Sequence, residues 1–169
     1  MWLLLAILSF VTPADEINFD LTKSSAAEWE FKDNCWKFVD DSKTLSQHTK
    51  KSNYKPPHRS PRHIALLKKH SVSDFELTVE IKSTHKDYNH RDACLFFGYQ
   101  NAGQYYYVHL GKKTDPYANQ IFIVNKADRT KISLTTTAGT PWDDDWHKVK
   151  LTRDSNTGNI AVYLSLIHI

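Results

Sequence analysis

The sequence predicts an all-β protein, an antiparallel β-sandwich. Apolar and polar residues alternate in several short stretches, turn-forming residues separate these stretches, and helical periodicity is scarce. Aromatic residues, which favour strands, make up 12% of the 169 residues, and 40% of the chain is hydrophobic, enough to bury the core of one domain. Many short strands with such spacing are typical of a sandwich or a barrel.

The first element is an uninterrupted apolar run, residues 1–11, which ends at Thr12-Pro13-Ala14. The run is too short for a permanent transmembrane helix, which needs about 20 residues. Apolar runs followed by small residues are typical of signal peptides, so we expect cleavage after Ala14 and a secreted or periplasmic protein. The alternative is a buried first strand or helix. No later segment is long enough to span a membrane, so no stable membrane insertion is expected after the signal is removed.

The strands that follow are predicted from two-residue alternation or short apolar runs in residues 75–82, 95–99, 105–110, 121–124, 131–135, 147–153 and 160–163. Turn residues at 100–104 predict a hairpin, and those at 154–159 predict another. Residues 64–67 are too few to form a helical face. Residues 42–63 are polar, basic and proline-bearing, which predicts a long surface excursion.

Composition excludes several classes of protein. The chain has 22 basic and 19 acidic residues and a net charge of +3, too small an excess to indicate a nucleic-acid partner. Two cysteines cannot build a disulfide scaffold, although Cys35 and Cys94 can form one disulfide in an oxidising compartment or remain buried thiols. The chain contains no phosphate-binding glycine loop and no Gly-x-Ser-x-Gly elbow, which leaves nucleotide and common esterase chemistry without support.

Three segments resemble a known family. The strand at 146–153 reads W-H-K-V-K-L-T-R and is followed by G-N-I-A-V-Y at 158–163, as in concanavalin A-like lectin/glucanase and laminin-G-like domains. Residues 36–41 and 74–80 resemble the opening strand and the D-F-x-L strand of these sandwiches, and also those of secreted bacterial 3-keto-disaccharide hydrolase-like domains. The resemblance implies a concanavalin A-like jelly roll over residues 15–163. The E-x-D-x-x-E signature of laminarinase-type glucanases is absent.

The last six residues, 164–169, read L-S-L-I-H-I, which matches one reading frame of a common transposase-library sequencing adapter. We therefore expect this tail to be non-native and the domain to be truncated at its C-terminus. The alternative is a genuine apolar strand.

The central hairpin and the strand after it carry the residue types that sugars require, namely aromatic rings for stacking and polar side chains for hydrogen bonds. The predicted carbohydrate-binding residues are Asp92, Tyr105, Tyr107, Asn119, Asn125 and Arg129. We expect Tyr105 and Tyr107 to share one face of their strand with His109, because side chains alternate along a strand. His109 beside Asp115 is the predicted acid–base pair of an enzyme, with Asp92 as the other carboxylate available to it. The alternative is that the tyrosines fill the core, while Asp115, Asn119 and Asn125 cap turns.

Other charged residues carry weaker predictions. Glu76 and Glu80 lie about 13 Å apart on one strand, too far to flank one glycosidic bond. Asp143-Asp144-Asp145 could hold Ca²⁺, although such a run is more often a solvated turn. The spacing of cysteine and histidine residues predicts no structural zinc site, and we expect no cofactor besides the possible Ca²⁺. Basic residues in 50–62 could meet an anionic polysaccharide or a membrane surface, although a solvated loop is favoured.

The sequence therefore predicts a secreted carbohydrate-binding domain with a glycan or polysaccharide as its partner. A glycoside hydrolase of the 3-keto-disaccharide type and a laminin-G-like protein-interaction module are the alternatives, because this sandwich hosts all three functions.

Overall fold

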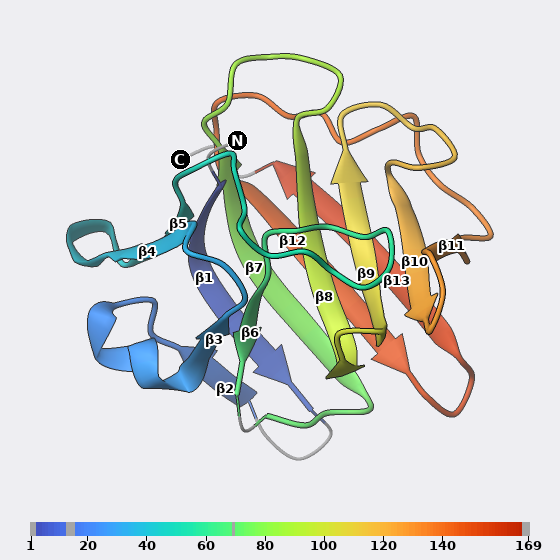
Figure 1. The fold of residues 1–169 in the computed structure, drawn as a ribbon, viewed down its shortest axis with the longest axis horizontal. Helices are drawn as coiled ribbons and strands as arrows, with labels where there is room; N and C mark the ends of the chain where they lie inside the picture. The colour runs from blue at the N-terminus through green and yellow to red at the C-terminus, as the bar shows by residue number, and fades with distance from the viewer. Residues whose placement is uncertain (1–2, 13–15, 69, 167–169) are drawn as a thin grey trace.

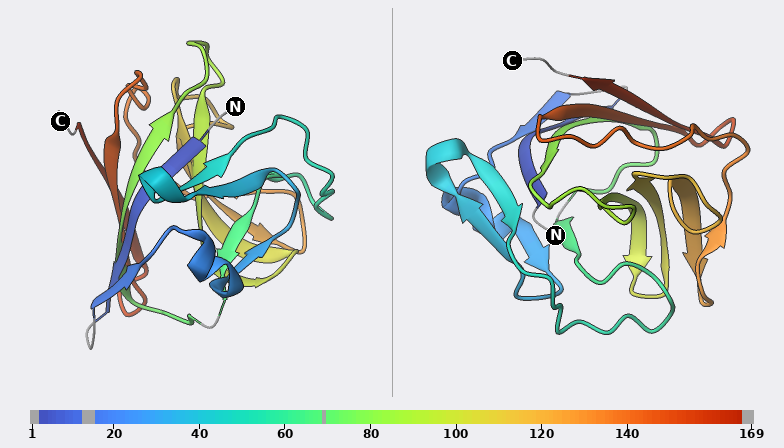
Figure 2. Two further views of the ribbon diagram at one scale, coloured as in Figure 1. Left: turned by 90° about the vertical axis from the view of Figure 1, so that its left-hand side faces the viewer. Right: turned by 90° about the horizontal axis from the view of Figure 1, so that it is seen from above.

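The computed structural model describes residues 3–12, 16–68 and 70–166 and confirms an all-β, antiparallel sandwich. Two sheets face each other across one main hydrophobic core (Figure 1; Figure 2, right). The strands are β1 (Leu3–Val11), β2 (Glu16–Phe19), β3 (Trp29–Phe31), β4 (Trp36–Val39), β5 (Thr44–Gln47), β6 (Ala65–Leu67), β7 (Phe75–Ser83), β8 (Asp92–Asn101), β9 (Gln104–Gly111), β10 (Gln120–Asn125), β11 (Thr130–Lys131), β12 (His147–Asp154) and β13 (Asn159–Leu166). Two short 3-10 helices, η1 (Lys23–Glu28) and η2 (Asp40–Ser42), lie in connections.

The larger sheet has the order β13-β12-β7-β1-β5-β4, with β2 paired to β1. Its centre follows directly from sequence alternation, because every second residue of β7 is buried. Leu77 lies opposite Leu151 of β12, and Val79 lies opposite Val149, so apolar side chains of neighbouring strands share the inner face. Residues 75–82 and 147–153 were predicted as strands of this kind, and both predictions are confirmed.

The second sheet has the order β11-β10-β9-β8 and contains the predicted central hairpin. The register of β8 against β9 shifts between Phe97 and Asn101, near Gly98, whose φ of 57° is in the left-handed region. One face of this sheet, including Leu95 and Val108, joins the main core. Its other face carries a separate cluster of buried rings, which includes the predicted binding residues Tyr105 and Tyr107.

A third, short pairing joins β3 to β6, and Trp29 of β3 packs into the main core. Between β5 and β6 lies the predicted excursion, and we call its residues 48–63 the cover segment. It runs in front of β8 and β9 (Figure 1). Its exposure alternates, with odd-numbered residues from 51 to 59 exposed and even-numbered ones half-buried, as in an extended chain laid on a surface.

The ends of the chain adopt strands that the sequence left as alternatives. β1 lies between β7 and β5, and Leu3, Leu5 and Leu8 are buried in the main core. The predicted cleavage after Ala14 falls in 13–15, outside the described residues, and removal of 1–14 stays a prediction. At the other end, β13 pairs with β12 as far as Leu166, and 167–169 lie outside the described residues. The non-native origin of 164–169 also stays a prediction.

Candidate functional site

The outer face of the four-stranded sheet brings the predicted aromatic residues together. Tyr105 and Tyr107 alternate along β9, and Phe122 of β10 stacks on Tyr107 with ring centroids 5.1 Å apart. The rings are buried, with Tyr105 2%, Tyr107 0% and Phe122 1% exposed. Burial raises the pKa of both tyrosine hydroxyls. The predicted sharing of one face is thus confirmed, and the face forms a second, small core.

The cover segment shields this face. Arg59 N–H donates to Asp128 Oδ1 at 2.8 Å, and Arg129 N–H donates to the Arg59 carbonyl at 3.3 Å, which fastens the segment to the end of β10. On the neighbouring hairpin turn, a Cβ built on Gly103 would meet the His58 ring at 3.6 Å. A sugar can therefore reach Tyr105 and Tyr107 only after the cover segment moves. Their role in stacking stays a prediction.

His109 follows these tyrosines on β9 and is held on both sides. Its Nδ1 donates to the Tyr117 carbonyl at 2.9 Å, and its Nε2 lies 3.2 Å from Asp92 Oδ2. The side chains of His109 and Asp92 are 11% and 18% exposed, so solvent reaches the pair. Asp92, rather than the predicted first choice Asp115, is the carboxylate at the imidazole. Such a carboxylate fixes the orientation of a histidine, as acid–base chemistry requires.

Arg129 joins this pair to the ring cluster. Its Nη1 donates to the Tyr107 hydroxyl at 3.1 Å, and its guanidinium lies 5.0 Å from the Phe122 ring centroid. Tyr117, 55% exposed, lies beneath two cations, Arg59 at 5.0 Å and Arg129 at 5.8 Å. The edge of the cluster therefore presents an accessible aromatic ring with guanidinium groups against it.

Among Asp92, His109, Arg129 and Tyr117, two buried polar atoms have no hydrogen-bond partner within the part of the chain that the structure describes, Asp92 Oδ1 and Arg129 Nε. One accepts and the other donates, so together they offer what a hydroxyl group requires. Buried polar atoms are normally satisfied, which makes unsatisfied ones useful pointers to a ligand.

The remaining predicted residues hold turns. Asp115 accepts the Tyr117 N–H at 2.6 Å through Oδ1. Asn119, at φ 55° and 9% exposed, donates its amide to Thr114 Oγ1 at 2.8 Å and accepts from Thr140 Oγ1 at 3.2 Å. Asn125 is exposed at the end of β10 and accepts from Gln104. These contacts fit the capping alternative, and a sugar-binding role for the three residues stays a prediction.

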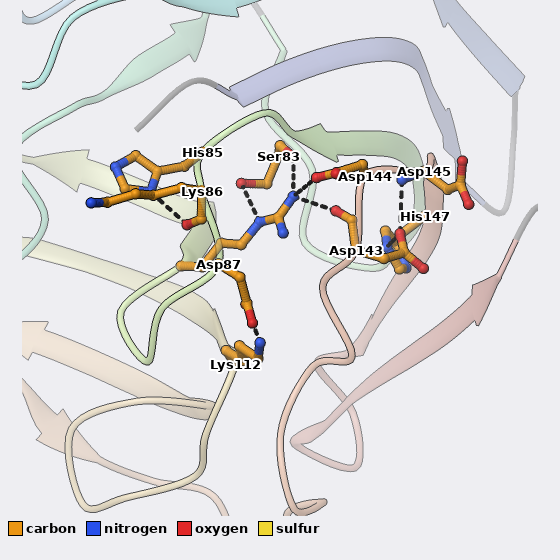
Figure 3. Close-up of polar contacts among 10 residues, drawn as sticks. Ser83, His85, Lys86, Asp87, Lys112, Asp143, Asp144, Asp145 and His147 are labelled. Carbon is orange, nitrogen blue, oxygen red and sulfur yellow. Dashed lines mark hydrogen bonds and ion pairs between the residues drawn. The ribbon is translucent and has the colours of Figure 1, made fainter.

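The acidic run before β12 is engaged by the protein itself (Figure 3). Asp143 Oδ1 accepts the Asp145 N–H at 2.8 Å and contacts His147 Nε2 at 2.9 Å, and these bonds lower the pKa of Asp143. Asp144 Oδ1 accepts from Arg91 Nη2 at 2.9 Å. Two of the three carboxylates thus have protein partners, and the calcium prediction gains no support from their geometry.

A cluster that the sequence did not predict lies where residues near the two ends of the cover segment come together. The ligand atoms of Asp33, Cys35 and His63 all lie within 4.8 Å of one another. Cys35 and Cys94 are both free thiols, and burial raises the pKa of each. The only local signal is the D-x-C spacing, because His63 is distant in sequence and is brought in by strand pairing.

A mainly apolar cavity of about 440 Å³ also lies between the layers. Leu5, Trp29 and Phe75 are among the side chains that line it, and they belong to the main core. None of the predicted carbohydrate-binding or acid–base residues lines this cavity. We therefore place the candidate site at Asp92, His109, Arg129 and Tyr117, on the outer face.

Comparisons with protein-family models, with curated proteins and with solved structures find no match to this chain. Across the described residues, no helix is both long enough and apolar enough to cross a membrane.

Proposed function

We propose that this chain is a secreted, concanavalin A-like carbohydrate-binding domain, and that the glycan binds at the Asp92–His109–Arg129–Tyr117 edge of the four-stranded sheet. The observation that carries the proposal is the unsatisfied acceptor and donor, Asp92 Oδ1 and Arg129 Nε, in one cluster with the exposed Tyr117 ring. Sugars offer hydroxyls to such polar atoms and C–H faces to such rings.

The cluster has features that suit recognition of a sugar rather than of a purely apolar ligand. The side chains of His109 and Asp92 are partly accessible, and they can carry opposite charges. Arg59, which is exposed, adds a second guanidinium above Tyr117. Guanidinium groups bind carboxylates and other anions with paired hydrogen bonds. The glycan class that we expect is therefore one that carries acidic sugars.

A glycan array followed by calorimetry tests this proposal. We expect binding of acidic glycans in preference to neutral ones, and Tyr117→Ala should weaken it about two- to tenfold, the loss of one ring contact of about 0.5–1.5 kcal/mol. Tyr163→Ala is the matched control, because Tyr163 is also an exposed tyrosine, at 58%, and lies on β13 of the other sheet. Absence of glycan binding, or equal losses in the two variants, would count against the proposed site.

A second candidate function, glycoside cleavage of the 3-keto-disaccharide hydrolase type, is favoured by one observation. His109 lies between a carboxylate and a carbonyl that fix its ring, which is the arrangement of a general acid or base. Release of 3-keto-glucose or reducing sugar should then be abolished by His109→Ala and by Asp92→Asn. Glu80→Gln should leave it unchanged, because Glu80 lies on β7 of the other sheet. Turnover that persists in His109→Ala would exclude this function for the pair.

A further inference from the structure

The cluster at the end of the cover segment begins with the register of two strands. β3 and β6 are antiparallel, and beyond their last pair Lys32 N–H donates to the Ile64 carbonyl at 3.0 Å. The next residues outward are Asp33 on one strand and His63 on the other. His63 Nδ1 accordingly lies 3.2 Å from Asp33 Oδ2. The pair is therefore positioned by a ladder of backbone hydrogen bonds and not by a free loop.

Cys35 is placed by a different ladder. β4 and β5 continue outward beyond their last pair, and His48 N–H donates to the Cys35 carbonyl at 2.8 Å. The Cys35 thiol donates to the Lys51 carbonyl at 3.1 Å, and the Cys35 backbone N–H donates to Asp33 Oδ1 at 2.8 Å. The second bond orients the Asp33 carboxylate, so that its other oxygen, Oδ2, faces His63.

These contacts gather three different metal-ligating groups at a site screened from water. Cys35 is 0% exposed, the Asp33 side chain is 0% exposed, and that of His63 is 21% exposed. One thiol, one imidazole nitrogen and one carboxylate oxygen within 4.8 Å form a set that borderline-soft divalent metals prefer. The partly exposed imidazole provides the entry path.

We propose that Asp33, Cys35 and His63 form a binding site for Zn²⁺, with Asp33 Oδ2, Cys35 Sγ and His63 Nδ1 as ligands. In a tetrahedral zinc site, neighbouring ligand atoms lie about 3.3–3.8 Å apart, given bonds of about 2.0–2.3 Å. The three ligand atoms here lie within 4.8 Å of one another, so the widest separation must shorten by about 1.0–1.5 Å at most when a metal binds. The fourth position falls to water or to Ser52 Oγ, which lies 3.0 Å from Asp33 Oδ2.

The charges of such a site cancel. Zn²⁺ carries two positive charges, and the ionised Cys35 and Asp33 carry one negative charge each, while His63 binds as the neutral imidazole. A neutral complex is the one that a buried site tolerates, since uncompensated charge is costly away from water. Burial raises the pKa of Cys35, so the metal displaces a thiol proton, which leaves to solvent as the Zn–S bond forms.

The competing explanation is that the same contacts only anchor the cover segment. Ser52 and His63 stand at its two ends, and both contact Asp33 Oδ2. An anchor of this kind needs no metal, so metal binding separates the two explanations.

The test uses the full chain, made metal-free and titrated with Co²⁺ as a spectroscopic substitute for Zn²⁺. We expect one Co²⁺ per chain, the visible bands of tetrahedral cobalt and a near-ultraviolet thiolate-to-cobalt band, all removed by added Zn²⁺. Cys35→Ser should abolish the thiolate band, and Cys94→Ser, the control for the other thiol, should keep it. A wild-type chain without these bands, or a band that survives Cys35→Ser, overturns the proposal.

The histidine is tested in the same way. His63→Ala should weaken Co²⁺ binding by more than the roughly tenfold typical of losing an outer-shell partner. His58→Ala is its control, because His58 lies in the same segment and outside the cluster. Equal weakening in both variants overturns the assignment of His63. X-ray absorption of the zinc-loaded wild-type chain needs no variant and should show one sulfur neighbour at about 2.3 Å, while the absence of sulfur overturns the site.

Discussion

Replacing Arg91 with alanine should destabilise the fold far more than removing its acidic partner. Arg91 is 2% exposed, and its Nε donates to Ser83 Oγ at 3.1 Å, while Nη2 donates to the carbonyls of Ser83 and Asp143. Ser83 is itself 0% exposed, so water cannot replace these donors there. The two buried hydrogen bonds to Ser83, at about 1.5–3 kcal/mol each for a charged donor, already predict a loss of at least about 3 kcal/mol in the free energy of unfolding.

The ion pair with Asp144 contributes much less. The Asp144 side chain is 91% exposed, against 2% for Arg91, so solvent screens the pair. Exposed ion pairs contribute about 0.2–1 kcal/mol, so Asp144→Asn should lower the free energy of unfolding by no more than that. Urea unfolding followed by tryptophan fluorescence, with equal slopes in all variants, measures both changes. If Asp144→Asn costs as much as Arg91→Ala, the ion pair and not the buried carbonyl contacts stabilises this corner, and the reasoning is refuted.

Two further predictions concern backbone space and pH. Gly139→Ala should lower the free energy of unfolding by about 3 kcal/mol, because φ is +152° and a Cβ would lie 2.0 Å from the Lys112 carbonyl oxygen. Gly158→Ala, at φ +74° with nothing within 4 Å, should cost only about 1 kcal/mol, and similar losses in both variants by urea unfolding would contradict the steric argument. Hydrogen bonds from the Asp145 N–H and then from His147 lower the pKa of Asp143 below its ordinary 3.8, so this carboxylate stabilises the fold above that pH. This contribution should be lost as pH falls through the lowered pKa. Asp143→Asn should therefore make the free energy of unfolding less dependent on pH at acidic pH. An unchanged pH dependence in this variant would contradict the prediction.

Much of the sandwich could be predicted from sequence because its signal is local. In β7 and β12, a two-residue period directly specifies which side chains face the core. The hairpin of β8 and β9 was likewise readable from the turn residues between two apolar runs. These features depend on neighbours within a few positions, so a single sequence contains them.

The cover of the outer face was not predictable in this way. The half-buried residues of the cover segment include Ser52, Pro56, His58 and Ser60, which carry no apolar pattern. The segment is held by hydrogen bonds to Asp128 and Arg129, which are almost 70 residues away along the chain. Side chains of Tyr105 and Tyr107 were correctly assigned to one face, but whether that face is open depends on this distant contact.

The candidate site itself shows the same division. His109 was predicted as a member, and its two carboxylate candidates were Asp115, six residues ahead, and Asp92 on the preceding strand. The β8–β9 register places Asp92 opposite Gly111 and Cys94 opposite His109, which brings the Asp92 carboxylate to the imidazole. Nearness in sequence favours Asp115, whereas the register between two antiparallel strands brings Asp92 to the imidazole.

The sequence predicts that residues 1–14 are removed on export, whereas residues 3–11 form β1 of the larger sheet. Cleavage after Ala14 would remove β1, and β7 and β5 would then lose the strand that lies between them. The main core would also lose the buried side chains of Leu3, Leu5 and Leu8. Cleavage would leave unpaired backbone groups on β7 and β5 beside an apolar face, and such strand edges are templates for pairing with another strand. We therefore expect an exported, cleaved chain to expose or re-pair these edges, whereas the chain that keeps β1 pairs both strands with its own residues.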